Sequence, residues 1–388
     1  MPTPAALNIQ PSDASWREAA SLIILAEDSS SNQLSTSQFD YSILMVKRSG
    51  GSSFMASAFV FPGGQLEQSD FDPKWYQLFD SNGMSRSQLD RVFTEQIVGP
   101  RPPIVNDTLT LKKLNSNQQS EILNPNVALR ISAIRETFEE AGILLLTKIP
   151  ELTNPKGYSS AIELTQPELV DWQLRVRNSA NTFYDLCEHL GMVPNIWSLY
   201  EWSDWLTPVS VGHRRFDTIF YICALGAKPV VRVDNAEVTK PIWCNPVSIL
   251  EEHRKELVFL APPQVYELSR MLNYKELERF HRYIKARQVL GTDRWLPVML
   301  TYDDGSISVL PGDERYPTEP ELVCKSPYLE LSGSVDDINR ESKHKNRIDL
   351  RGIQSRALCT IEPGCGHLPP ITYEENFKFP KEQIKPKL

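Results

Sequence analysis

The stretch Arg135-Glu136-Thr137-Phe138-Glu139-Glu140-Ala141-Gly142-Ile143 places three glutamates at spacings that fit one face of a helix. Positions 136, 139 and 140 are related by i, i+3 and i+4, so a helix stacks their carboxylates and like charges repel. Arg135 is expected to project elsewhere and to orient one glutamate without neutralising the cluster. A divalent cation such as Mg²⁺, which prefers oxygen ligands, would remove the repulsion. The alternative is a solvated acidic helix face.

The helix that carries these glutamates is predicted from 126 to 141. Its apolar residues recur at spacings of three and four, typical of one buried face: Val127, Ile131, Ile134 and Phe138. Asn126 is the expected N-cap, and Gly142 is the expected residue just past the end, where a left-handed backbone favours glycine.

Short apolar stretches on both sides of the helix predict strands. Ala19 to Leu25 and Tyr41 to Val46 are rich in aliphatic residues, and Phe216 to Leu225 has the same character. The segment Phe59 to Phe61 runs into Pro62-Gly63-Gly64, a strong turn signal.

The residues around the glutamates resemble the signature of the Nudix hydrolase family, G-x5-E-x7-R-E-U-x-E-E-x-G-U, where U is aliphatic. Its second half matches from Arg135 to Ile143, with Thr137 at the first U position. Its first half matches at Gly64, but Asp70 stands at the first Glu position. Residues 71–134 separate the halves, 64 residues where the signature has 7. We interpret the excess as an insertion, which a loop accommodates at modest entropic cost.

This resemblance implies a fold and a domain division. The expected fold is α/β, a Nudix α/β/α sandwich with a mixed sheet. The Nudix domain is predicted at 15–317, with the insertion at about 68–126 inside the signature. Residues 318–388 are predicted to form a polar C-terminal extension, partly disordered, with little core of its own.

The resemblance also implies a chemistry. Glu136, Glu139 and Glu140 are expected to bind Mg²⁺ or Mn²⁺, with Arg135 completing the catalytic set. Bound metal would neutralise phosphate charge and lower the pKa of a water that attacks one phosphorus. Glu136 and Glu237 remain alternatives for the group that removes the proton from this water.

A second pattern points to the substrate. Nudix enzymes that cleave coenzyme A carry L-L-T-x-R-[SA]-x3-R-x3-G-x3-F-P-G-G before the signature. Arg48, Ser49 and Phe61 to Gly64 fall in register with it, while Ser53 and Ser57 stand where the pattern has Arg and Gly. Four later segments resemble the peroxisomal acyl-CoA diphosphatase branch of the family, which also has a long insertion in its signature: Trp205 to Pro208, Arg214 to Thr218, Arg294 to Pro297 and Leu310 to Glu314.

This branch implies cleavage of coenzyme A (CoA) and acyl-CoA to 3′,5′-ADP and a 4′-phosphopantetheine product. The residues expected to bind this substrate are Arg48, Ser49, Gly63, Gly64, Arg214 and Arg215. The last two begin a predicted strand, where paired guanidinium groups can hold phosphates, although they could equally be solvated or pair with carboxylates. Trp75, Tyr76 and Phe79 of the insertion are expected either to line an acyl groove or to belong to the core.

Two other functions stay open. One is a Nudix diphosphatase for ADP-ribose or dinucleotides, and the other is a non-catalytic module that binds nucleotides. The three intact glutamates favour catalysis over a silent module. With 41 basic and 49 acidic residues, the net charge of −8 argues against a general nucleic-acid partner.

Composition and the chain ends suggest a location. Mean hydropathy is −0.33 and no apolar run approaches the roughly 20 residues of a membrane helix, so no membrane association is expected. The first residues, MPTPAALNIQ, lack a secretory signal pattern. The end, Pro386-Lys387-Leu388, departs from the peroxisomal S-K-L address at its first position, and binding to the peroxisomal import receptor is expected. The predicted location is the peroxisome, or otherwise the cytoplasm.

Overall fold

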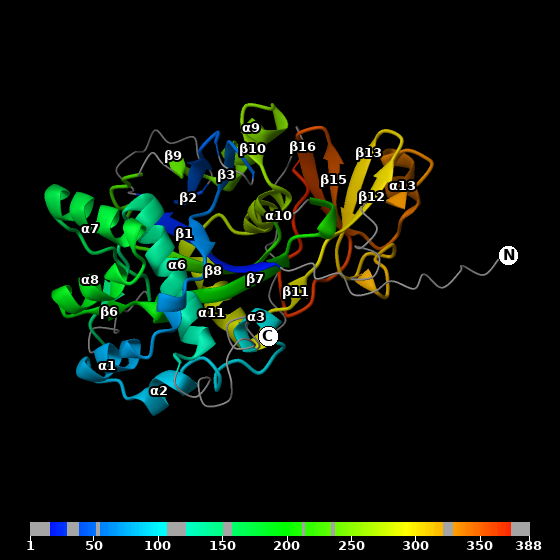
Figure 1. The fold of residues 1–388 in the computed structure, drawn as a ribbon. Coiled ribbons are helices and arrows are strands. Elements are labelled where there is room, and N and C mark those ends of the chain that lie inside the picture. Colours follow the sequence, from blue (N-terminus) through cyan, green and yellow to red (C-terminus); the bar gives the residue numbers. More distant parts are fainter. Residues whose placement is uncertain are drawn as a thin grey trace.

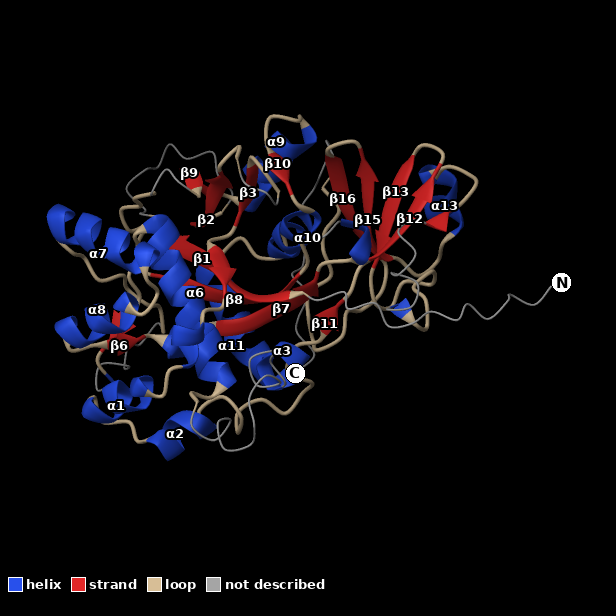
Figure 2. Ribbon diagram, viewed as in Figure 1, coloured by secondary structure: helices blue, strands red, loops and turns tan. Residues whose placement is uncertain are grey.

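The computed structural model describes residues 16–28, 39–51, 55–106, 122–149, 157–211, 214–233, 237–320 and 329–373. The Ser53 position and the C-terminal tripeptide lie outside these ranges. Helices flank a central mixed sheet, and a second sheet lies at one side of the molecule (Figures 1 and 2).

The central sheet has the strand order β10-β3-β2-β1-β8-β7-β11, with β4 paired to β1 and β9 paired to β2. Its strands are β1 (Arg17–Glu27), β2 (Tyr41–Arg48), β3 (Ala58–Val60), β4 (Gly63–Gln65), β7 (Tyr200–Leu206), β8 (Phe216–Leu225), β9 (Val238–Cys244), β10 (Phe259–Leu260) and β11 (Arg294–Trp295). β1 runs parallel to β8 and antiparallel to β2, so the sheet is mixed, as predicted.

Alternate residues of β1 enter two different cores, which is why the sheet is covered on both faces. Leu22 and Ile24 pack with α6 (Pro125–Ala141), α7 (Gln166–Asn178) and α8 (Thr182–Leu190). Ile23 and Leu25 pack with the second set of helices: α9 (Pro246–Arg254), α10 (Pro262–Met271) and α11 (Leu277–Arg287). This arrangement confirms the predicted α/β/α sandwich.

Helix α6 begins one residue earlier than predicted. The side chain of Asn124, rather than Asn126, caps it by accepting a hydrogen bond from the Asn126 N–H at 2.9 Å, and Pro125 occupies the first turn. The helix ends as predicted at Gly142, whose φ of 69° lies in the left-handed region.

The insertion packs against the core instead of standing apart from it. It contains the helices η1 (Gln68–Phe71), α1 (Lys74–Ser81), α2 (Arg86–Arg91) and α3 (Pro103–Asn106). Trp75, Tyr76 and Phe79 are buried in one cluster with residues of α6 and α8, so the core alternative holds for these three aromatics.

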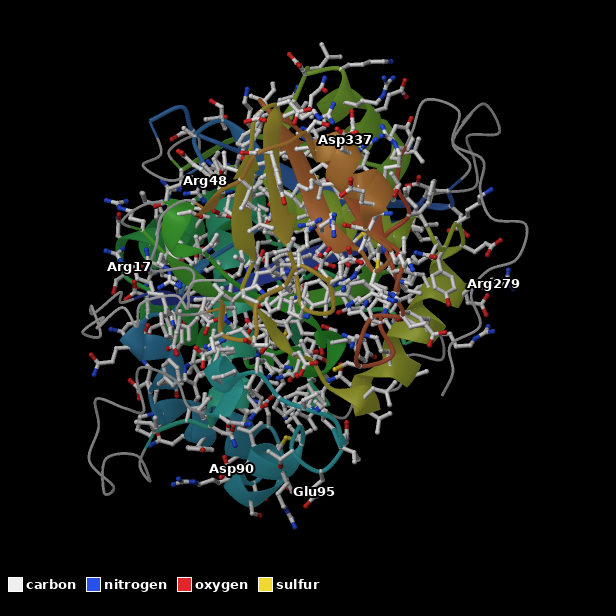
Figure 3. All side chains as sticks on the ribbon, turned by 90° about the vertical axis from the view of Figure 1, so that its right-hand side faces the viewer. Arg17, Arg48, Asp90, Glu95, Arg279 and Asp337 are labelled. Atoms are coloured by element: carbon white, nitrogen blue, oxygen red, sulfur yellow. The ribbon has the colours of Figure 1, made fainter. Side chains whose placement is uncertain are left out.

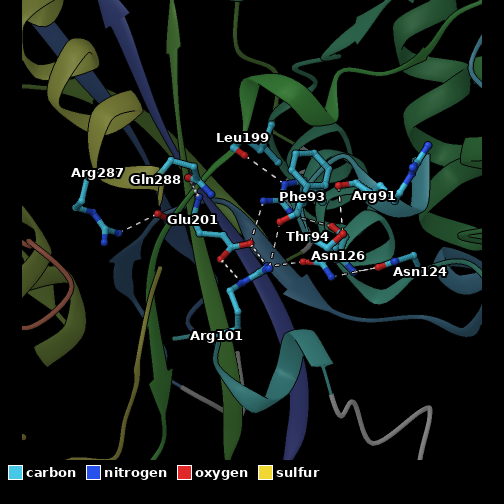
Figure 4. Close-up of polar contacts among 11 residues, drawn as sticks. Arg91, Phe93, Thr94, Arg101, Asn124, Asn126, Leu199, Glu201, Arg287 and Gln288 are labelled. Atoms are coloured by element: carbon cyan, nitrogen blue, oxygen red, sulfur yellow. Dashed lines mark hydrogen bonds and ion pairs between the residues drawn. The ribbon is translucent and has the colours of Figure 1, made fainter. Parts of the chain in front are cut away.

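A charged contact fixes the end of the insertion to the central sheet. Arg101 forms hydrogen bonds with Asn126 and with Glu201 on β7, and Arg130 of α6 reaches the same Glu201 carboxylate at 3.0 Å (Figure 4). The Arg130 guanidinium also lies 3.6 Å from the centre of the Phe93 ring. Because both arginines satisfy one buried carboxylate, the insertion is fastened to β7 and α6 together.

The second sheet corrects the predicted C-terminal extension. It comprises β14 (Leu329–Glu330), β12 (Val298–Tyr302), β13 (Gly305–Val309), β15 (Asn346–Arg351) and β16 (Gln354–Cys359), with α13 (Val335–Glu341) beside it. Since β15 pairs with β13, the sheet crosses the predicted boundary at 317. Residues Ile348 and Ala357 belong to the core that contains α10. The polar sequence did not indicate this core, because some of its charged residues are themselves buried. Arg347 forms a two-pronged ion pair with Asp313, at 2.6 and 2.7 Å.

Short elements complete the described chain. They are β5 (Leu146–Thr147), β6 (Val193–Pro194), η3 (Ile196–Ser198), η4 (Val209–Val211) and η5 (Gln288–Leu290). The predicted helical pattern from 167 to 190 divides into α7 and α8. Within the described residues, no helix is both long enough and apolar enough to cross a membrane.

Candidate active site

The two separated halves of the signature meet in space. Asp70 from the first half and Arg135 from the second form a two-pronged ion pair, with Nε–Oδ1 at 2.8 Å and Nη2–Oδ2 at 2.9 Å. Both side chains are almost fully buried, so this pair is shielded from solvent. Asp70 therefore replaces the expected Glu as a structural carboxylate that holds the loop against α6.

Arg135 contacts more of the glutamates than predicted. Its Nη1 donates to Oε1 of Glu136 at 2.8 Å and to Oε1 of Glu139 at 2.6 Å. We expected this arginine to orient one glutamate, whereas it contacts two. Its Nε and Nη2 contact Asp70, which leaves Nη1 for both glutamates.

The two glycines of the turn contact the glutamates directly. The Gly63 N–H donates to Oε2 of Glu140 at 3.0 Å. At Gly64, a Cβ atom would lie 2.4 Å from Oε2 of Glu136, so the close approach of backbone and carboxylate requires glycine. Gly63 and Gly64 thus serve the site by placing the backbone against the acidic face of α6.

Burial and crowding make the acidic face costly to ionise. Burial, assisted by the neighbouring Glu139 and opposed by Arg135, raises the pKa of Glu136 to about 8. Burial also raises the pKa of Glu139. The pKa of Glu140 lies well above its usual value because the group is buried beside Glu136, although the Gly63 N–H opposes the shift. A cluster of this kind is typical of a functional site.

The donor set fits a divalent cation. The hydrogen bonds described above are accepted by Oε1 of Glu136, Oε1 of Glu139 and Oε2 of Glu140. The other oxygen of each carboxylate takes no part in those bonds. Carboxylate oxygens are the ligands that Mg²⁺ and Mn²⁺ take, and positive charge would offset the repulsion. In the described part of the chain, no group of three or more acidic, His or Cys side chains has the arrangement of a ready-made metal site.

A cavity of about 690 Å³ lies against this face of α6. Arg135, Glu136 and Glu139 line it together with Gly63 and Gly64. Its size is in the range of pockets that hold small molecules, roughly 300–1,000 Å³. Arg135, Glu136 and Glu139 therefore open onto a space that can take a substrate, whereas Glu140 is buried outside the lining.

Of the other predicted substrate residues, one lines the cavity and three do not. Arg48, at the end of β2, lines the cavity, and its charge acts on Glu140 (labelled in Figure 3, viewed from the side of the second sheet). Ser49 follows it and donates its N–H to the Glu237 carbonyl at 2.8 Å, outside the lining. Arg214 is exposed, and buried Arg215 donates to the Thr207 carbonyl at 2.8 Å. The structure does not bring Arg214 and Arg215 to the cavity wall.

Several cavity residues were missing from the predicted site. One is Arg177, which adjoins the α7–α8 connection and lines the same cavity. The proposed base Glu237 also lines it. The rest of the wall is mixed, with polar residues such as Gln264 and Ser308, and its apolar side chains include Phe61, Trp205, Leu206, Phe216, Phe220 and Met299. The resemblance to the acyl-CoA branch at 205–208 was the signal that could have identified Trp205 and Leu206.

The fold and the reunited signature together define a Nudix hydrolase. Comparison with known families agrees, because the model described as the NUDT19 Nudix domain matches residues 16–271. The model of the NUDT19 C-terminal domain matches residues 299–360, the region of the second sheet. The chain belongs to the NUDT19 family of Nudix hydrolases.

Named relatives extend over most of the chain. The acyl-coenzyme A diphosphatase NUDT19 of Xenopus laevis is 36% identical over 94% of this chain and 97% of its own length. The human protein of the same name is 34% identical, over 88% and 90%. Among solved structures, a NUDIX hydrolase from Alicyclobacillus acidocaldarius is 20% identical with a TM-score of 0.45, covering 68% of this chain and 95% of that one.

Proposed function

We propose that this protein is a divalent-metal-dependent diphosphatase that cleaves the pyrophosphate bond of CoA and acyl-CoA esters. The products would be 3′,5′-ADP and 4′-phosphopantetheine, free or acylated. One observation carries the proposal: a single cavity joins the glutamate face of α6 to a wall of apolar side chains. A substrate with a diphosphate at one position and a long, partly apolar arm fits such a cavity. The names of the Xenopus and human relatives support the same substrate class.

The residues of the site divide the chemistry among them. Glu136, Glu139 and Glu140 would hold Mg²⁺ or Mn²⁺, which supplies charge neutralisation and an acidified water when bound. Asp70 and Arg135 keep α6 in register with the glycine turn, through the contacts at 2.8 and 2.9 Å.

Other lining residues would bind substrate and move the proton. Arg48 and Arg177 place positive charge on the cavity wall, where guanidinium groups can hold phosphate oxygens. Glu237, a lining residue whose charge acts on Glu139, is positioned to accept the proton of the attacking water, as is Glu136.

The decisive experiment is a substrate panel with purified protein. CoA, acetyl-CoA, dodecanoyl-CoA, 3′-dephospho-CoA, ADP-ribose and NADH are incubated with Mg²⁺, with Mn²⁺ and with a chelator. We expect metal-dependent release of 3′,5′-ADP from CoA or its esters. The Glu140→Gln variant should lose at least about 100-fold in kcat/KM, while Glu95→Gln, at an exposed position of the insertion, should behave as the wild type.

The other outcomes discriminate among the alternatives. Preference for ADP-ribose or NADH would retain the diphosphatase chemistry and refute the CoA assignment. Tight nucleotide binding without turnover of any substrate, in either metal, would favour the non-catalytic module.

We also propose a peroxisomal location. The support is the match of Lys387 and Leu388 to the last two residues of the S-K-L address, which lie outside the described residues. A fluorescent protein fused ahead of the full chain should gather in peroxisomes, and deletion of the last three residues should release it. Uniform fluorescence from the intact fusion would exclude this address.

A further inference from the structure

One face of the central sheet forms an apolar floor in the cavity. β8 contributes Phe216, Thr218 and Phe220, and Thr218 is paired with Trp205 on β7. Residues paired across neighbouring strands project from the same face, so Trp205 lies beside the β8 residues. This floor lies on the opposite side of β1 from the core that contains α6.

The Trp205 ring is held in place by α10. Its Nε1 donates to Oε1 of Glu267 on α10 at 2.8 Å, and Arg270 pairs with the same carboxylate at 3.0 Å. Glu267 and Arg270 are completely buried. Because its polar atom is satisfied inside the protein, the indole adds an apolar side chain to the cavity lining, although only 4% of the residue is exposed.

The second sheet also contributes to the wall of this cavity. Met299 on β12 and Ser308 on β13 are paired in register and both line the cavity. Their neighbours Val298, Leu300 and Ile307 are buried in a separate cluster on the other face of the same sheet. The alternation along β12 and β13 therefore directs Met299 and Ser308 toward the cavity.

We propose that the space between Trp205 and Met299 is the binding site for the acyl chain, and that Met299 sets the chain length this protein accepts. The inference rests on the proposed function. In an acyl-CoA the pantetheine arm separates the acyl group from the diphosphate. The apolar floor is formed by β7 and β8, whereas the glutamates that line the cavity come from α6. A flexible thioether side chain can adapt to chains of different length. Burial of each methylene is favourable by about 0.8 kcal/mol.

Two substitutions at Met299 test the site with opposite signs. Values of kcat/KM are measured for CoA, acetyl-CoA, hexanoyl-CoA and dodecanoyl-CoA, with thermal unfolding of each variant as a check on folding. Met299→Trp fills the space and should lower the dodecanoyl-CoA to acetyl-CoA ratio about tenfold, the loss of about two methylene contacts. Met299→Ala enlarges the space and should raise the same ratio.

Controls separate this site from general effects. Thr301→Met changes the same strand at a position outside the cavity lining and should leave the ratio at the wild-type value. Equal losses on all four substrates in Met299→Trp, or an unchanged ratio in both Met299 variants, would overturn the acyl site while leaving the proposed function intact. A wild-type protein that cleaves no CoA compound would instead refute the proposed function itself.

Discussion

At the scale of single residues, the neighbouring glycines 63 and 64 have separable roles. A Cβ at Gly63 would lie 2.4 Å from the Ala20 carbonyl oxygen and 2.6 Å from Cα of Ser21, which are backbone atoms that cannot rotate away. A Cβ at Gly64 would instead meet the end of the Glu136 side chain, which can rotate. Gly63 is therefore needed for the close approach of its strand to β1, and Gly64 for the position of the Glu136 carboxylate.

This difference predicts different failures for two matched variants. Gly63→Ala should lower the free energy of unfolding by about 1–3 kcal/mol, because the strand pair must separate. Gly64→Ala should displace Glu136 and lower kcat by about tenfold or more, with little change in stability. Urea unfolding and steady-state kinetics of both proteins check the prediction. Equal stability losses would show that the Glu136 carboxylate is as rigid as backbone.

Ser57 is a residue under backbone strain. Its φ of 61° lies in the left-handed region, where the CoA-associated sequence pattern has glycine. Ser57→Gly should raise the free energy of unfolding by about 0.5–1 kcal/mol, because the steric cost of this conformation disappears. Ser87→Gly, inside α2, should do the opposite. A lower urea midpoint for Ser57→Gly would contradict the prediction.

The chemistry-bearing residues were largely predictable, but their contacts were not. The spacing of Glu136, Glu139 and Glu140 identified the acidic helix face because i, i+3 and i+4 positions depend only on local geometry. The pairing of Arg135 with Asp70 spans 65 positions, and no local pattern encodes it. For the same reason Met299, which comes from the second sheet, entered the site only when the cavity lining was known.

At the scale of elements, three buried acidic side chains come from neighbouring strands of the central sheet. Glu18 on β1 is paired with Asp217 on β8, and Asp204 on β7 is paired with Arg294 on β11. Burial raises the pKa of Asp217 to about 6, although Arg294 opposes this with an Nη1–Oδ2 contact at 3.4 Å. Burial and the nearby Asp217 also raise the pKa of Asp204 well above its usual value.

These shifts predict how stability depends on pH. Because the pKa of Asp217 is higher in the folded chain than in the unfolded chain, the folded state binds more protons between about pH 4 and 6. This contribution to stability is present at low pH and is lost as pH rises through about 6. Asp217→Asn removes this contribution. The free energy of unfolding of the variant, relative to that of the wild type, should therefore increase from pH 4.5 to pH 7 in urea unfolding. Exposed Asp171→Asn is the control, and parallel curves for wild type and Asp217→Asn would refute the shift.

Elements with strong periodicity were predicted well. The strand patterns at 41–46 and 216–225 and the helix at 126–141 agree with β2, β8 and α6 within a few residues. The prediction was poorer where burial of polar side chains replaces apolar spacing. Arg347 in β15 and Arg130 in α6 are completely buried through their partners, and no hydropathy pattern marks such positions.

At the scale of the whole molecule, the second sheet is an integral part of the fold. Its strands β12 and β13 precede the predicted boundary at 317 and β15 and β16 follow it. A chain ending at 317 would expose the edge of β13 and remove Ile348, Ala357 and Leu368 from the core.

Truncation tests this integration directly. The chain ending at 317 should be insoluble or lose several kcal/mol of stability, because an unpaired strand edge and a core cavity both result. A chain ending at 373 retains every described element and should keep wild-type stability and activity. Circular dichroism and thermal unfolding of the two fragments decide the matter. A stable, active fragment 1–317 would show that β15 and β16 are dispensable for the fold.

The divided signature also affects the order in which the protein folds. Asp70 and Arg135 are 65 positions apart, so their ion pair forms only when the chain between them closes a long loop. Contacts of long sequence separation form slowly, because chain entropy is lost before they reward it. A newly made chain can therefore fold α6, with all its glutamates, well before it acquires a working site. We therefore expect the complete site to assemble late in folding, when Asp70 reaches Arg135.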